Sequence, residues 1–140
     1  MPTVQLRYSC EFCAAYRLAR PDWSEERNRE VYGVCASPHG HGHNYQLEVV
    51  VEGEVDLEHG MVLDYMRLQE LVQRRIVAEV DHLHLNHDVP WLEGIVPTSE
   101  NLLVAFWPRL AEELPSGVHL YRLSLQESRD HTAIYHGPRR

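Results

Sequence analysis

Residues 40–52 read Gly-His-Gly-His-Asn-Tyr-Gln-Leu-Glu-Val-Val-Val-Glu, a strand-like segment that begins with two closely spaced histidines. Its β-branched run, Val49–Val51, predicts a strand over Tyr45–Glu52. Just before it, His41 and His43 are two residues apart, so an extended backbone points both imidazoles to one side. Two histidines placed in this way favour a metal site, although a histidine-rich loop without a metal has the same spacing.

The composition is that of a single acidic domain. With 140 residues the chain has the length of one domain, and its formal net charge of −8 argues against nucleic acid as a partner. It contains no lysine, so all 13 residues counted as lysine or arginine are arginine. Schiff-base chemistry and a phosphate-loop lysine are therefore excluded, and a phosphorylated ligand depends on arginine, histidine or backbone N–H groups.

Cysteine usage and hydropathy predict a reduced, cytoplasmic protein. The three cysteines are an odd number, and no apolar leader precedes them. Cys10 and Cys13 form a Cys-x-x-Cys, but residues three apart in a strand face opposite ways, so we do not expect a redox or zinc pair. No stretch reaches the roughly 20 apolar residues of a membrane span, so no membrane partner is expected.

The first half of the chain predicts two strands with a polar excursion between them. Val4–Leu18 reads as the first strand, and Glu25–Val31 as a short helix that Asp22 or Ser24 caps. After the second strand, Glu52–Gly60 is expected to make a hairpin connection to three extended residues.

Two amphipathic helices follow. Asp64 is expected to cap the first, whose apolar stripe comprises Leu68, Leu71, Val72, Ile76 and Val80. Asp81–Gly94 reads as an irregular loop, and Thr98 or Ser99 begins the second helix. The core stripe of this helix is predicted to comprise Leu102, Leu103, Phe106, Leu110 and Leu114. Pro108 lies within it and predicts a kink rather than a break.

Two strands are expected to end the chain, Val118–Gln126 and Thr132–His136. In the first, Tyr121 is expected to share the apolar face that ends at Glu127. The order ββααββ predicts an α+β fold, an antiparallel sheet with two helices on one face.

Six motifs run through nearly the whole chain: Phe12-Cys-Ala-Ala-Tyr-Arg-Leu18, Tyr32–Tyr45, Gly60-Met-Val-Leu-Asp-Tyr65, Val80-Asp-His-Leu-His-Leu-Asn86, Pro97-Thr-Ser-Glu-Asn-Leu102, and Gln126-Glu127 before Ile134-Tyr135. In this order they resemble the 6-pyruvoyl-tetrahydropterin synthase / 6-carboxy-tetrahydropterin synthase family. The resemblance implies a single domain over residues 1–140 with the tunnelling fold, in which trimers close a barrel and two trimers stack into a hexamer. It also implies a lyase whose substrate is a pterin triphosphate, 7,8-dihydroneopterin triphosphate, and whose site lies between subunits. Either 6-pyruvoyl- or 6-carboxy-tetrahydropterin is the implied product.

The resemblance implies zinc bound by three histidines, and His41 and His43 match two of them. The third position holds Tyr16. Three alternatives stay open: a phenolate ligand, a two-histidine site completed by water and substrate oxygens, or a site that has lost the metal. We expect zinc at partial occupancy. His39 is expected in a loop outside the ligand set.

The proton-transfer residues implied by the resemblance are Cys35 and the pair Asp81-His82. In such a pair the carboxylate fixes the tautomer and orientation of the imidazole. Alternatively, Cys35 is a buried structural thiol, and His82 only stabilises the end of a helix. His84 and His87 match no motif position and are expected on the surface.

The resemblance implies that Glu127 anchors the pterin. The amino-pyrimidinone edge of a pterin offers two parallel N–H donors, which a carboxylate accepts as a bidentate pair. Thr98 and Ser99 imply a second set of pterin contacts, and Glu100 is either part of that set or an acid at a helix N-terminus. A pterin-binding relative that has lost full zinc ligation and catalysis is the rival hypothesis. Tyr16 favours it, whereas the proton-transfer matches oppose it.

Overall fold

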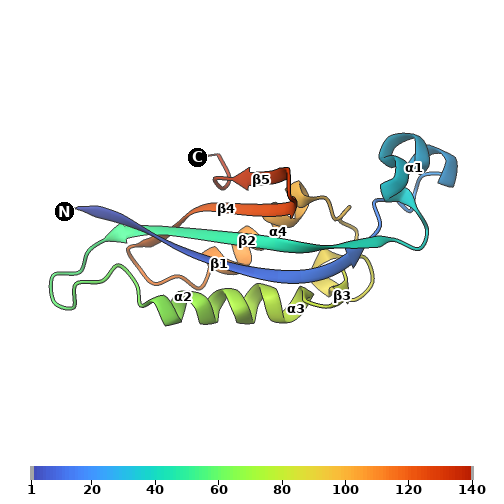
Figure 1. Ribbon diagram of the computed structural model, residues 1–140. Helices are drawn as coiled ribbons and strands as arrows, with labels where there is room; N and C mark the ends of the chain where they lie inside the picture. The colour runs from blue at the N-terminus through green and yellow to red at the C-terminus, as the bar shows by residue number, and fades with distance from the viewer. Residues whose placement is uncertain (1, 140) are drawn as a thin grey trace.

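The computed structural model describes residues 2–139 as one five-stranded sheet with helices on one face (Figure 1), which confirms the predicted α+β class. The strands are β1 Thr3–Tyr16, β2 His41–Glu54, β3 Leu83–His84, β4 Val118–Ser128 and β5 His131–Tyr135. The helices are α1 Glu25–Tyr32, α2 Tyr65–Val72, α3 Ala78–Val80 and α4 Ser99–Ala111. Gly33–Ala36 and Pro90–Leu92 form 3₁₀ turns, and Gln73–Val77 forms a π-helical turn that joins α2 to α3.

The long β1–β2 pair organises the sheet. The two strands are antiparallel over their whole length, from Thr3 opposite Glu54 to Tyr16 opposite His41. β2 pairs with β4 and β4 with β5, both antiparallel, so the strand order is β3-β1-β2-β4-β5. The four predicted strands are therefore confirmed, and β2 begins at His41 rather than Tyr45 because the histidines belong to the strand.

Two expectations about connections were wrong. The loop Asp81–Gly94 contains β3, which pairs in parallel with Ala14 and Ala15 of β1. The segment Met61–Leu63 joins no strand of the described chain and leads directly into α2. A turn forms there instead of a hairpin because the carboxylate of Asp56 accepts backbone N–H groups of the two residues that follow Leu57.

Two bulges interrupt β4. At the first, Arg122 pairs with Val50 and Leu120 with Val51, so Tyr121 between them lies outside the ladder. Tyr121 is 40% exposed, and its predicted place on the apolar face was wrong because one extra residue reverses the alternation of faces. The second bulge, in the pairing with β5, lies at Glu127.

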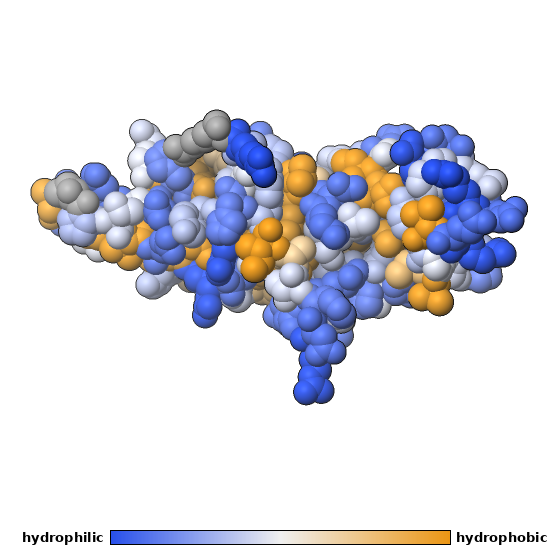
Figure 2. Space-filling model, turned by 90° about the horizontal axis from the view of Figure 1, so that it is seen from above, coloured by the Kyte–Doolittle hydropathy of each residue, from blue (hydrophilic) through white to orange (hydrophobic). Residues whose placement is uncertain are grey.

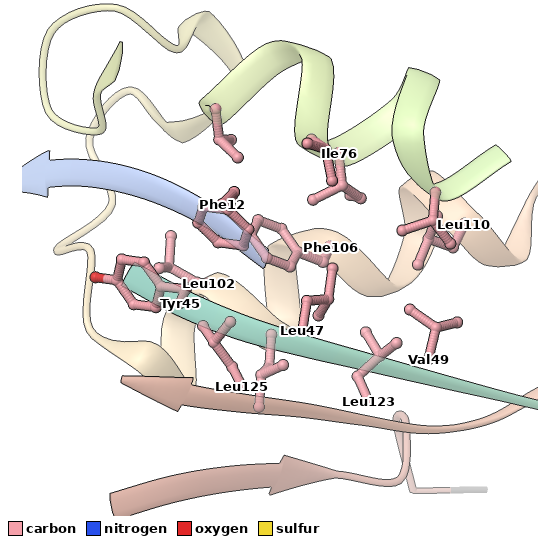
Figure 3. Packing of buried hydrophobic residues seen from close by; sticks show 14 of the residues in the cluster. Phe12, Tyr45, Leu47, Val49, Ile76, Leu102, Phe106, Leu110, Leu123 and Leu125 are labelled. Carbon is pink, nitrogen blue, oxygen red and sulfur yellow. The ribbon is translucent and has the colours of Figure 1, made fainter. Parts of the chain in front are cut away.

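The helices pack their predicted apolar stripes against the sheet in a single core (Figure 3). Asp64 caps α2 as expected, by accepting the Met66 N–H. α4 runs unbroken through Pro108, and a kink there stays a prediction; Leu114 lies beyond the end of this helix and is half-buried. Across the core, the rings of Phe12 and Tyr45 stack with centroids 4.9 Å apart. Among residues 2–139, no helix combines the length and apolar character that crossing a membrane requires.

The polar excursion forms a lobe beyond one end of the sheet. α1 projects there in Figure 1, next to the end of β1 and the start of β2, and in Figure 2 the outline is hollowed between this right-hand lobe and the body. Ser24 caps α1, whereas Asp22 pairs with Arg20. Val31 and Val34 are exposed on the lobe, which leaves apolar surface at this end of the sheet.

Candidate active site

Three strand ends bring the main candidate residues together. Tyr16 ends β1 opposite His41, the first residue of β2. His43 follows on the same face of β2, and Glu127 lies near the end of β4, the next strand in the sheet. Side chains that share a face of neighbouring strands are in contact distance, so residues far apart in the chain meet at one edge of the core.

The Tyr16 hydroxyl links Glu127 to His43. It donates to Glu127 Oε1 at 2.5 Å, and His43 Nε2 lies 3.2 Å from the same phenolic oxygen. A phenol has one proton, so the network assigns an N–H to His43 Nε2, which donates to Tyr16. Burial of Tyr16, and then its bond to Glu127, raise the pKa of this hydroxyl far above the usual range. Tyr16 is therefore a neutral donor.

Tyr45 adds a hydroxyl to the site that sequence reasoning missed. The side chain is fully buried, and its oxygen makes no hydrogen bond to any residue between 2 and 139. The hydroxyl points away from the apolar cluster (Figure 3), and the ring lies 5.9 Å from that of His43. A buried hydroxyl without a partner is costly, so a water or ligand atom is expected beside it. Strand alternation was the missed signal, because Tyr45 follows His41 and His43 at the next alternate position.

Cys35 lies beside the end of β1. Its carbonyl accepts the Leu18 N–H at 2.8 Å, and the Arg17 Nε–H donates to the Ala36 carbonyl at 2.8 Å. These bonds fold the excursion back against the strand, where Cys35 is half-buried with a free thiol. His39 is exposed in the adjoining loop, as expected.

Asp81 and His82 form the predicted contact on the opposite edge of β1. His82 Nδ1 lies 3.0 Å from Asp81 Oδ2, and Asp81 Oδ1 accepts the Cys13 N–H at 2.9 Å. The His82 side chain is 80% exposed, and no hydrogen bond or ion pair within residues 2–139 joins it to Tyr16 or Cys35. Farther along the loop, the rings of His84 and His87 stack 4.3 Å apart; His87 is exposed and His84 is half-buried, so the surface prediction holds only for His87.

The comparisons with known proteins show the family of the chain. The family model described as 6-pyruvoyl tetrahydropterin synthase matches residues 5–138. The chain belongs to this family. It is 39% identical to the 6-pyruvoyl tetrahydrobiopterin synthase of Poecilia reticulata over 90% of this chain and 85% of that protein. It is 37% identical to the synthase of the same name from Homo sapiens, over 96% and 92%.

The solved structures include a near match over the full length. The structure of Caenorhabditis elegans 6-pyruvoyl tetrahydropterin synthase covers 99% of this chain and 98% of that one, with 34% identity and a TM-score of 0.91. The predicted family is thereby confirmed, and with it the prediction that the chain is an enzyme of the pterin-synthase type.

Thr98 and Ser99 lie at the start of α4 and are not part of the hydrogen-bonded group around Glu127. Their motif resembles a pterin contact of this family. The Thr98 hydroxyl caps α4 by accepting the Asn101 N–H at 3.1 Å. Ser99 is buried, and its hydroxyl has no partner within the described chain. Neither residue forms a hydrogen bond to Glu127, so their pterin contacts stay a prediction.

The donor set of Tyr16, His41 and His43, where the resemblance implies zinc, does not fit a three-ligand zinc site. Catalytic zinc takes three protein ligands, and each histidine must present an unprotonated nitrogen at about 2.0–2.1 Å. The rings of His41 and His43 are 5.2 Å apart, close enough to share an ion, but His43 Nε2 is engaged by the Tyr16 hydroxyl at 3.2 Å. The Tyr16 hydroxyl keeps its proton and donates it in a hydrogen bond to Glu127, which opposes a phenolate ligand. Between residues 2 and 139, no group of three or more His, Cys, Asp or Glu side chains is arranged to hold a metal ion.

Proposed function

We propose that this chain is a lyase that eliminates triphosphate from 7,8-dihydroneopterin triphosphate, giving 6-pyruvoyl- or 6-carboxy-tetrahydropterin. The observation that carries the proposal is the carboxylate of Glu127. It lies in a bulge at the end of β4 and is 30% exposed, and only its Oε1 is bound by a side chain of residues 2–139. Oε2 is free to accept an N–H of the amino-pyrimidinone edge, and Oε1 has a second lone pair for the other.

The elimination needs a base and an acid near the pterin side chain. A proton leaves the carbon next to the triphosphate-bearing carbon, the C–O bond to triphosphate breaks, and an enol remains that tautomerises to a ketone. The side-chain carbon on the ring becomes a second ketone as its two hydrogens pass to the C=N bond of the dihydropterin ring, which gives the 6-pyruvoyl-tetrahydro product without an external oxidant. The 6-carboxy product requires in addition that water cleaves the side chain with release of acetaldehyde. Cys35, in the turn beside Tyr16, is the proposed base. His82 is the proposed proton carrier, oriented by Asp81 through the 3.0 Å contact. With no lysine in the chain, arginine and backbone N–H groups hold the departing triphosphate.

We propose further that two chains build each site, in a trimer or hexamer. Within one chain, β1 separates Asp81 and His82 from the group around Tyr16. A broad hollow of about 960 Å³ lies elsewhere, between residues 52–67 and 115–119, and no candidate residue lines it. The exposed Val31 and Val34 beside the site offer apolar surface for a neighbouring chain. The predicted barrel and cytoplasmic location stay predictions.

A second candidate function is a pterin-binding protein without lyase activity. The hydrogen bonds that join Tyr16 to Glu127 and His43 favour this function. They hold the Tyr16 side chain at the position where the resemblance implies zinc, and without the metal the substrate hydroxyls are not acidified. A binder needs Glu127 but has no use for Cys35 or for the Asp81–His82 pair.

Mass spectrometry of the products formed from 7,8-dihydroneopterin triphosphate separates the two functions. The lyase proposal expects release of triphosphate and a new pterin with the mass of the 6-pyruvoyl or 6-carboxy compound. Unchanged substrate, together with measurable pterin binding in an equilibrium titration, would establish the binding protein instead. Absence of both turnover and binding would contradict both functions.

A further inference from the structure

The metal position of this family is filled here by a side chain. The Tyr16 ring packs 4.7 Å from the ring of His41 and 5.7 Å from that of His43. Its hydroxyl lies between His43 Nε2 and Glu127 Oε1, at 3.2 and 2.5 Å. Tyr16 therefore makes bonds at the place where the two histidines would otherwise meet an ion.

An ion could enter only if Tyr16 moved, and the packing opposes that movement. Tyr16 is 1% exposed and is held in the core beside Tyr45, with ring centroids 6.5 Å apart. Rotating it outward would break the bond to a charged carboxylate and leave Glu127 Oε1 without its donor. Zinc bound by two histidines alone offers little to offset those losses, because it lacks the third protein ligand of catalytic sites.

We propose that Tyr16 replaces the metal in this chain and acts as a positioning residue for Glu127. The hydroxyl fixes Oε1, which sets the plane of the carboxylate and presents Oε2 toward the ligand. The ligand class is a planar amino-pyrimidinone with two parallel N–H donors, of which a pterin is one example. The proposal rests on the pterin-binding part of the proposed function and is independent of whether the chain eliminates triphosphate.

The first test is the metal content of the purified full-length protein, measured by elemental analysis after incubation with zinc and dialysis. The unmodified protein is expected to retain far less than one zinc per chain. Tyr16→His is expected to retain nearly one, and the double variant Tyr16→His, His43→Ala is expected to lose that gain. Full zinc occupancy in the unmodified protein would overturn the proposal, and this measurement needs no variant to fold.

The second test is the affinity for 7,8-dihydroneopterin, a ligand that carries the pterin ring without the triphosphate. Tyr16→Phe keeps the ring and removes only the hydroxyl, so the dissociation constant is expected to rise about three- to tenfold, the equivalent of one ordinary hydrogen bond. Tyr16→Phe should gain no zinc. Equal or tighter binding by a folded Tyr16→Phe protein would show that Tyr16 does not position Glu127.

A matched control removes a tyrosine hydroxyl elsewhere on the same sheet. Tyr121 lies six residues before Glu127 in β4, about 20 Å away along the strand, and is partly exposed. Tyr121→Phe is expected to leave both zinc content and pterin affinity unchanged. Neither measurement depends on turnover, so a chain without lyase activity could still satisfy this proposal, and an active zinc lyase would contradict it.

Discussion

The two edges of β1 carry the two halves of the candidate site, and they differ in how complete they are. On the β2 side, Tyr16, His43 and Glu127 form a largely buried network whose hydrogen bonds close within one chain. On the β3 side, Asp81 and the backbone N–H of His82 are both tied to the backbone of Cys13, but the His82 side chain is exposed and contacts Asp81. One chain therefore assembles the binding half around Glu127, whereas Asp81 and His82 are presented outward, which is the basis of the proposal that a second chain completes the site.

The largest effect is expected at Cys35, the proposed base. Cys35→Ala should abolish turnover of 7,8-dihydroneopterin triphosphate while pterin affinity and the oligomer stay intact, because the thiol acts only in chemistry. The measurement is a steady-state product assay with a parallel binding titration. Cys10→Ala, which removes a thiol farther back along β1, is the control and should remain active.

Mixing inactive subunits tests whether the halves come from different chains. Cys35→Ala and His82→Ala, each inactive alone, should regain about a quarter of the activity when they are dissociated and reassembled in equal amounts. A shared site is active only when its Cys35 and its His82 both come from chains that keep that residue, and random assembly gives this combination in about one site of four. If the mixture stays inactive after exchange is verified, the two halves belong to one chain. If Cys35→Ala alone is fully active, Cys35 is not the base, and His82 becomes the first candidate for that role.

A smaller but well-defined effect is expected in the binding half. Glu127→Gln keeps an acceptor for Tyr16 but turns an N–H₂ toward the N–H donors of the pterin. Pterin binding should therefore weaken by about 1.5–3 kcal/mol, the range for a hydrogen bond to a charged group. Isothermal titration measures it, and Glu93→Gln, at an exposed position in the turn before α4, is the control. Unchanged affinity would remove the main support for a pterin ligand.

The smallest effect concerns acid stability at the other edge. The Cys13 N–H, and then His82, lower the pKa of Asp81 against the opposing effect of burial. Because the pKa is lower in the folded chain than in the unfolded one, this contribution is present above the ordinary aspartate pKa of about 3.9 and is lost as the pH falls through the folded value.

Asp81→Asn removes that titration. The difference in unfolding free energy between the unmodified protein and Asp81→Asn should therefore shrink as the pH is lowered through the acid range, in urea unfolding at a series of pH values. Asp130→Asn, in the exposed β4–β5 turn, is the control. Parallel stability curves for the unmodified protein and Asp81→Asn would mean that the bond to Cys13 does not favour the charged carboxylate.

Features with a local cause were predicted from the sequence. Ser24 and Asp64 begin helices because a side-chain oxygen reaches an N–H two or three residues on, and both caps are found. His41 and His43 share a face because strand alternation acts between next-but-one residues. The contact of Asp81 with His82 needs only adjacency in the chain. These are short-range effects, so one sequence suffices to find them.

Other features appear only in the folded chain, because they depend on residues far apart in the sequence. β3 exists because a loop reaches the free edge of β1, and the bulges of β4 arise where its register with β2 and β5 slips. The sequence marked Tyr16 as a departure from its family, but it did not show which residue Tyr16 would bind. Its partner is Glu127, 111 residues later in the chain. Folding brings the Glu127 carboxylate to 2.5 Å from the Tyr16 hydroxyl. Pairing across such a distance follows from strand order and register, which no local pattern encodes.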